Sequence, residues 1–80
     1  EEFVILLPDT DIKGAEAVMQ RLQRELTKHF FMHGEEKLLI TFSAGVTQVQ
    51  PEDAQAAVIK RADEAMYQAK QSGKNQVVTG

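Results

Sequence analysis

The sequence predicts a mixed α/β fold, with helices packed against a β-sheet. Residues 3–7 form an unbroken apolar run with the length and β-branched content of a buried strand, and residues 38–49 alternate between apolar and polar, as half-buried strands do. Residues 11–28 and 51–73 instead repeat apolar side chains at helical spacing. Strands and helices therefore alternate along the 80 residues, which make one small domain or part of one.

The first predicted strand runs from an acidic pair, Glu1 and Glu2, to Pro8, which ends it because proline cannot donate a ladder hydrogen bond. Side chains alternate across a strand, so the two carboxylates point to opposite faces and are expected to differ in role. One of them can ligate a divalent metal through oxygen, while the other holds a neighbouring cation or amide. The alternative is a solubilising pair of surface charges.

A helix is expected after this strand, because residues 9–11 (Asp-Thr-Asp) combine a turn with good capping side chains. Its apolar stripe consists of Ala15, Val18, Met19, Leu22 and Leu26. The helical pattern fades between residues 28 and 32, and residues 34–37 predict a polar loop.

Two histidines, His29 and His33, lie four residues apart, a spacing at which two imidazoles can bind one metal from a helix, with Glu35 and Glu36 nearby. His33 also adjoins Gly34 at the expected end of that helix. Histidine at such a position commonly bonds free carbonyl groups. We therefore interpret His33 as part of a helix end rather than as a metal ligand.

The second strand, residues 38–49, carries two small residues, Ser43 and Gly45, on one face. Either a ligand or a helix can approach closely there, and both alternatives stay open. Next, Pro51-Glu52-Asp53 predicts the start of a long helix, since proline is favoured in the first turn and acids at the positive end of the helix dipole. Gly73 ends this helix, and residues 75–79 predict a short edge strand.

Two lysines, Lys70 and Lys74, flank the end of the second helix. Cations complement the negative end of a helix dipole, which is one explanation for them. The functional alternative is a phosphate-binding pair, in which two ammonium groups near a carboxylate-bound metal hold a triphosphate.

The composition limits the classes of function. A net charge of −3 argues against unspecific nucleic-acid binding, and the absence of cysteine excludes a disulfide framework and a thiolate zinc site. The sequence contains no apolar run long enough for a membrane span and no signal peptide. A cytoplasmic location is expected, although a membrane tether elsewhere in the parent protein stays open. The Glu-Glu start without methionine suggests a piece of a longer protein.

Three stretches, residues 1–8 (EEFVILLP), 40–46 (ITFSAGV) and 61–75 (RADEAMYQAKQSGKN), occur in an order and with gaps that resemble the C-terminal half of a GGDEF domain, the diguanylate cyclase family. The resemblance covers essentially the whole chain. It implies a palm-like α+β fold of the nucleotidyl-cyclase type, with a mainly antiparallel sheet flanked by helices and truncated here at its N-terminus. Residues 1–80 would then be the C-terminal portion of a single GGDEF domain.

The resemblance also implies a chemistry, the condensation of two GTP molecules into cyclic di-GMP with release of pyrophosphate, in bacterial signalling. In the family's pattern, Glu1 is a metal ligand that also helps to activate the 3′-hydroxyl, and Glu2 supports the metal site. Lys70 and Lys74 match positions that bind the triphosphate tail. The implied cofactor is Mg²⁺ or Mn²⁺, and the implied partners are a second GGDEF protomer in a homodimer and an upstream sensor or receiver domain, with no nucleic acid.

The sequence departs from the family pattern in two substitutions. Position 74 is more often arginine, so a forked donor is replaced by a point charge, and Ala44 is smaller than the usual branched residue. The family's signature glycines, second metal-binding aspartate and guanine-reading residues lie before Glu1 in the pattern and are not in this sequence. The isolated fragment is therefore expected to be inactive. The alternatives are a degenerate GGDEF module that binds nucleotide and regulates a partner without catalysis, and a merely structural palm-like domain.

Overall fold

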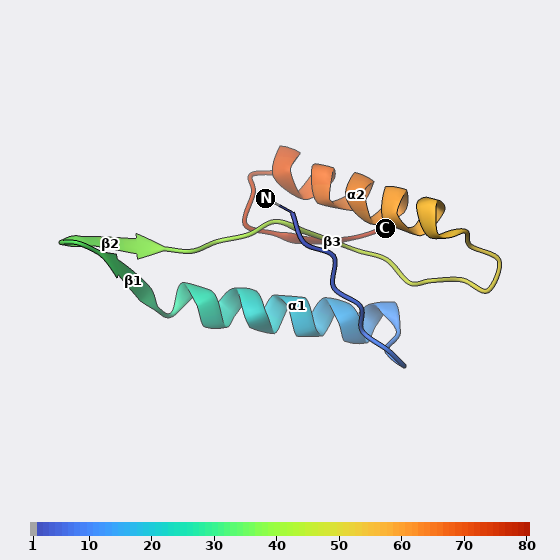
Figure 1. Ribbon diagram of the computed structural model, residues 1–80, viewed down its shortest axis with the longest axis horizontal. Coiled ribbons are helices and arrows are strands. Elements are labelled where there is room, and N and C mark those ends of the chain that lie inside the picture. Colours follow the sequence, from blue (N-terminus) through green and yellow to red (C-terminus); the bar gives the residue numbers. More distant parts are fainter. Residues whose placement is uncertain (1) are drawn as a thin grey trace.

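The computed structural model describes residues 2–80, and Glu1 lies outside the described residues. Two helices run along the two sides of a short pair of strands, and a β-hairpin extends from one end (Figure 1). The elements in chain order are α1 (Ile12–Thr27), β1 (Phe30–His33), β2 (Glu36–Leu39), β3 (Ala44–Val46), α2 (Gln55–Gln71) and β4 (Val77–Thr79). The predicted mixed α/β fold is confirmed.

The strands form two separate pairs. β1 and β2 are antiparallel, with Phe30 opposite Leu39 and His33 opposite Glu36. β3 and β4 are parallel, with Ala44 opposite Val77. Because parallel strands need a long crossover connection, α2 lies between β3 and β4 in the chain and packs on both.

Both ends of α1 and the C-terminal end of α2 lie close to the positions predicted from the sequence. The carboxylate of Asp11 accepts a hydrogen bond from the amide of Gly14 at 2.8 Å, which confirms the predicted cap of α1. α1 ends at Thr27, where its pattern fades. α2 ends at Gln71, just before Gly73, whose φ of +114° suits a glycine.

The start of α2 was predicted wrongly. Pro51 and Glu52 form a turn, and the helix begins only at Gln55. Asp53 does not open the helix because its carboxylate has other partners: it accepts a hydrogen bond from the amide of Gln50 at 2.8 Å and binds Arg61.

The predicted loop at residues 34–37 is correct for Gly34 and Glu35 but wrong for Glu36 and Lys37, which belong to β2 of a β1–β2 hairpin. Gly34, with φ +65°, and Glu35 form its two-residue turn. The aromatic residues Phe30 and Phe31 favour a strand here, so His33 lies in β1 rather than at a helix end.

Two predicted strands differ from the observed ones. Residues 2–7 are not assigned to a strand, and Phe3 and Leu6 are 83% and 80% exposed, because no described segment forms a ladder with them. Residues 38–49 are divided, because residues 36–39 pair with β1 while residues 44–46 pair with β4.

The core lies between α1, α2 and the β3–β4 pair. It is built from small side chains, with Ala15, Val46, Ala65 and Ala69 buried. A Cβ atom on Gly45 would lie 2.0 Å from the carbonyl oxygen of Ala62, so α2 packs directly on the backbone of β3. Close helix packing is therefore the correct alternative for Gly45. Within residues 2–80, neither helix is long and apolar enough to cross a membrane.

Candidate functional site

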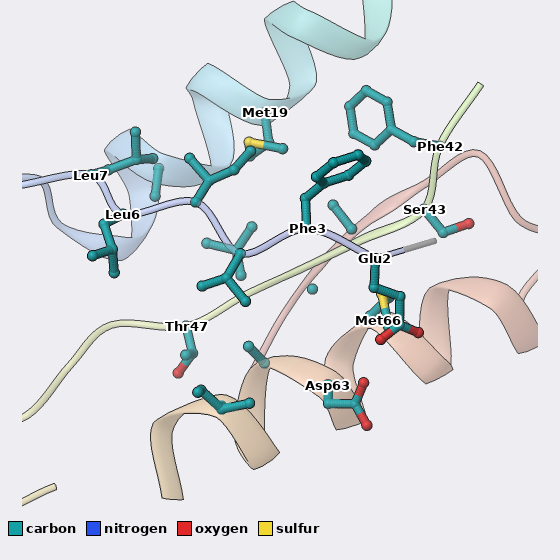
Figure 2. A pocket seen from close by; sticks show the side chains of 18 of the residues that line it. Glu2, Phe3, Leu6, Leu7, Met19, Phe42, Ser43, Thr47, Asp63 and Met66 are labelled. Atoms are coloured by element: carbon teal, nitrogen blue, oxygen red, sulfur yellow. The ribbon is translucent and has the colours of Figure 1, made fainter. Parts of the chain in front are cut away.

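An open groove runs between the N-terminal segment, residues 40–49 and the inner faces of the helices. Figure 2 shows its two kinds of wall. Phe3 points toward Phe42 and Met19 on the apolar side, while Glu2 extends toward α2, where it contacts Lys70. Glu2, Asp63, Lys70, Lys74 and Asn75 add polar groups to the lining. The N-terminal segment, which passes over β3 in Figure 1, thus brings Glu2 to α2.

Glu2 and Lys70 form an ion pair across this groove. The Nζ atom of Lys70 lies 3.6 Å from Oε2 of Glu2, and the two side chains are 44% and 61% exposed. Exposed pairs of this kind add little to stability, because water screens them. The contact matters more for chemistry, since it places a carboxylate, the group that binds hard cations, beside an ammonium, the group that binds phosphate.

Lys74 lies in a turn with an unusual backbone. Gly73, Lys74 and Asn75 all have positive φ, at +114°, +64° and +51°. This region is unfavourable for residues with a Cβ, so two successive non-glycine residues there need support from their surroundings. Part of this support is local, because the backbone amide of Lys74 donates a hydrogen bond to the carbonyl oxygen of Ala69 at 3.0 Å and so closes the end of α2.

The rest of the support comes from distant segments. The side-chain amide of Gln23, on α1, donates to Oδ1 of Asn75 at 3.0 Å and also to the Asn75 carbonyl oxygen. The backbone amide of Asn75 donates to the hydroxyl of Ser43 at 3.2 Å. Sequence reasoning singled out Ser43 for its small size and missed Gln23, which is 52 residues from its partner.

A second polar cluster fixes the connection between β3 and α2. Arg61 binds Asp53 with both terminal nitrogens, at 2.7 and 3.3 Å, and donates from Nε to the hydroxyl of Thr47 at 2.6 Å. The hydrogen bond from Arg61, helped by that from the Gln50 amide, lowers the pKa of Asp53 below 3.8, against a smaller opposing effect of burial. The bond to Asp53 also raises the pKa of Arg61, so this guanidinium stays charged.

The described residues offer only part of a metal site. Carboxylate oxygen is the donor that Mg²⁺ or Mn²⁺ prefers, so Glu2 fits such an ion chemically. Across residues 2–80, however, no three acidic, histidine or cysteine side chains gather closely enough to hold a metal, and this includes His29 and His33. Of the four residues predicted for the site, Glu2, Lys70 and Lys74 line one groove, and Glu1 lies outside the described residues.

Comparison with known proteins identifies the family. The profile of the family described as "Diguanylate cyclase, GGDEF domain" matches residues 1–76. Response regulator PleD of Caulobacter vibrioides is 43% identical over 81 residues, covering 98% of this chain and 18% of PleD. Diguanylate cyclase DgcP of Pseudomonas aeruginosa is 39% identical, covering 96% of this chain and 12% of DgcP. Diguanylate cyclase DgcZ of Escherichia coli is 37% identical, covering 94% of this chain and 25% of DgcZ.

The chain therefore spans a quarter or less of the length of these three relatives. The match of the profile to nearly all of the chain nevertheless agrees with the order of the three motifs and with the mixed α/β fold. This chain belongs to the GGDEF domain family of diguanylate cyclases.

Proposed function

We propose that the protein containing this chain condenses two GTP molecules into cyclic di-GMP and releases two pyrophosphates. The main observation that supports the proposal is the ion pair of Glu2 and Lys70, at 3.6 Å, in a groove that Lys74 also lines. Two similar proteins, DgcP and DgcZ, are named diguanylate cyclases, which supports the same activity here.

Each proposed site residue has a distinct task. The ammonium groups of Lys70 and Lys74 bind the triphosphate tail through charge-assisted hydrogen bonds and so orient the α-phosphorus. Glu1 accepts the proton of the attacking 3′-hydroxyl, whose oxygen forms a bond to the α-phosphorus of the second GTP as the bond to pyrophosphate breaks. Glu1 also holds Mg²⁺ or Mn²⁺, with Glu2 in support, and the ion neutralises phosphate charge when bound.

The proposal extends to the organisation of the protein. Residues 1–80 form the C-terminal portion of a single GGDEF domain. Two protomers, each holding one GTP, face each other so that each hydroxyl attacks the other's α-phosphorus, and this makes a homodimer the catalytic unit. PleD is named a response regulator, which supports a receiver or sensor domain elsewhere in the protein. We expect the domain to work in the cytoplasm, without a nucleic-acid partner.

The test is to incubate the full-length protein with GTP and Mg²⁺ and to measure cyclic di-GMP by chromatography. Lys70→Ala is expected to raise KM for GTP about tenfold, since it removes a hydrogen bond between charged groups. The matched control is Lys60→Ala, because Lys60 is exposed on the same helix and is not part of the groove lining. Binding of GTP without product would instead favour the degenerate module that regulates a partner, and equal effects of both variants would remove the phosphate-binding role of Lys70.

A further inference from the structure

We propose that Gln23 of α1 is a positioning residue for nucleotide binding, which acts through Asn75 to hold the backbone of Lys74 in its left-handed conformation. The inference rests on the proposed function, because it assumes that Lys74 binds phosphate. It assigns a role to a helix whose residues are not among those proposed to touch the triphosphate.

The shape of the turn determines where the Lys74 side chain lies. The direction in which the Lys74 side chain leaves the main chain depends on its own φ of +64° and on the φ of +51° at Asn75. A residue with a Cβ relaxes readily from such values to negative φ. A relaxed turn would point the ammonium elsewhere, and a displaced group binds its ligand less tightly.

A set of contacts to Asn75 prevents this relaxation. The side-chain amide of Gln23 donates hydrogen bonds to both oxygens of Asn75, to the side-chain Oδ1 at 3.0 Å and to the main-chain carbonyl oxygen. The hydroxyl of Ser43, in the segment just before β3, accepts a hydrogen bond from the backbone amide of Asn75 at 3.2 Å. Asn75 is thus held through its amide, its carbonyl and its side chain. Asparagine also tolerates positive φ better than most residues, so its type suits the position.

Gln23 itself is held in place by the packing of α1. Gln23 is half-buried, and it projects from a 16-residue helix that also packs on β3 and β4. A side chain on a packed helix has little freedom to follow a moving loop. Gln23 therefore ties the turn after α2 to the core, and through this link α1 influences where the Lys74 ammonium lies.

The experiment uses Gln23→Met in the full-length protein, a change that keeps the length of the side chain and its helix propensity but removes the donor. Gln20→Met is the matched control on the same helix, since among residues 2–80 no hydrogen bond is made by the Gln20 side chain. Lys74→Ala and the double variant Gln23→Met/Lys74→Ala complete a double-mutant cycle. The probe is guanosine 5′-[α,β-methylene]triphosphate, in which the bond to be broken is replaced, and Kd is measured by calorimetry.

We expect Gln23→Met to raise Kd about three- to tenfold, because a displaced Lys74 ammonium weakens one hydrogen bond to phosphate. Gln20→Met is expected to change Kd less than about twofold. In the Lys74→Ala background, Gln23→Met is expected to have no further effect. A merely structural residue would weaken binding equally with or without Lys74. An additive loss of this kind, or no loss of binding in Gln23→Met, overturns the inference about Gln23. The proposed function is unaffected by either result as long as Lys74→Ala weakens binding.

The proposed function has its own readout in the same samples. If the wild-type protein binds the analogue but does not convert GTP, the catalytic proposal fails, and the cycle still decides whether Gln23 acts through Lys74. If the wild-type protein does not bind the analogue, both proposals are overturned.

Discussion

Gly45 of β3 lies directly against the backbone of Ala62 on α2, where an added Cβ would be 2.0 Å from the Ala62 carbonyl oxygen. The same Cβ would lie 2.3 Å from the amide nitrogen of Met66. Both are main-chain atoms in the middle of a helix, so neither can move without displacing α2. The closeness of α2 to β3 therefore depends on one missing methyl group.

Gly45→Ala is expected to destabilise the domain by about 3 kcal/mol or more, because overpacking against main-chain atoms cannot be relieved by rotating a side chain. Urea denaturation of the full-length protein measures the loss. The matched control is Gly14→Ala on α1, where a Cβ would meet the side chains of Thr10 and Asp11, which are partly exposed or exposed, and should cost less than about 1 kcal/mol. Similar costs at the two positions would contradict this account of the β3–α2 contact.

Features that depend on neighbouring residues could be predicted from the sequence. The cap at Asp11 and the helix end before Gly73 each involve residues within about one turn. The break between β2 and β3 could not be predicted, because it depends on β2 pairing with β1 and β3 pairing with β4. Asp53 shows the same limit, since its place outside α2 depends on Arg61, eight residues later.

In the candidate site, too, some residues could be predicted from the sequence and others could not. Lys70 and Lys74 could be identified by their spacing around the end of α2 and by the family's motif, and Glu2 by its place at the start of the apolar run. The link between Gln23 and Asn75 joins residues 52 positions apart, and glutamine on the polar side of a helix gives no signal of a partner. Only the packing of α1 against β3 and β4 brings the two together.

The ion pair of Asp53 and Arg61 predicts an acid-sensitive contribution to stability. The pKa of Asp53 is lower in the folded chain than its ordinary value of 3.8, mainly because Arg61 donates to the ionised carboxylate. The unfolded state therefore takes up this proton at a higher pH than the folded state. The contribution is fully present above about pH 5 and is lost as the pH falls through the folded-state pKa.

Asp53→Asn is expected to lower stability at neutral pH and to flatten the dependence of the urea midpoint on pH below about 5. Glu52→Gln is the control, since Glu52 is an exposed neighbouring acid in the preceding turn. An unchanged acid slope in Asp53→Asn would show that other carboxylates cause it.

The 80-residue chain on its own is expected to self-associate and to form no cyclic di-GMP. Large apolar side chains such as Phe3, Leu6, Phe30 and Met32 are exposed, and residues 2–7 leave ladder groups available for pairing with another copy. Light scattering after size-exclusion chromatography should show a mass that rises with concentration. A monomer with a sharp, concentration-independent melting transition would contradict the prediction.

Substitution of Lys74 tests whether its charge or its hydrogen-bond geometry matters. Lys74→Ala should mainly raise KM for GTP, about tenfold, because it removes a contact made to substrate and transition state alike. Lys74→Arg should lower KM, since a guanidinium binds two phosphate oxygens at once and is the residue more usual in the family's pattern. Steady-state kinetics of the full-length protein separate KM from kcat. A loss of activity in Lys74→Arg equal to that in Lys74→Ala would mean that the position does not contact phosphate.

Glu1→Gln is expected to lower kcat by about 10²–10⁴, with a smaller change in KM. The substitution keeps the shape of the side chain but removes the charge that holds a cation and the oxygen that accepts the 3′-hydroxyl proton. Glu2→Gln should have a smaller effect on kcat, because Glu2 is proposed only to support the metal site, and Glu35→Gln, in the exposed hairpin turn, should have none. If Glu1→Gln left kcat intact, Glu1 would not be catalytic. Glu1 and Glu2 would then be a pair of surface charges, and the contact of Glu2 with Lys70 would have no part in the reaction.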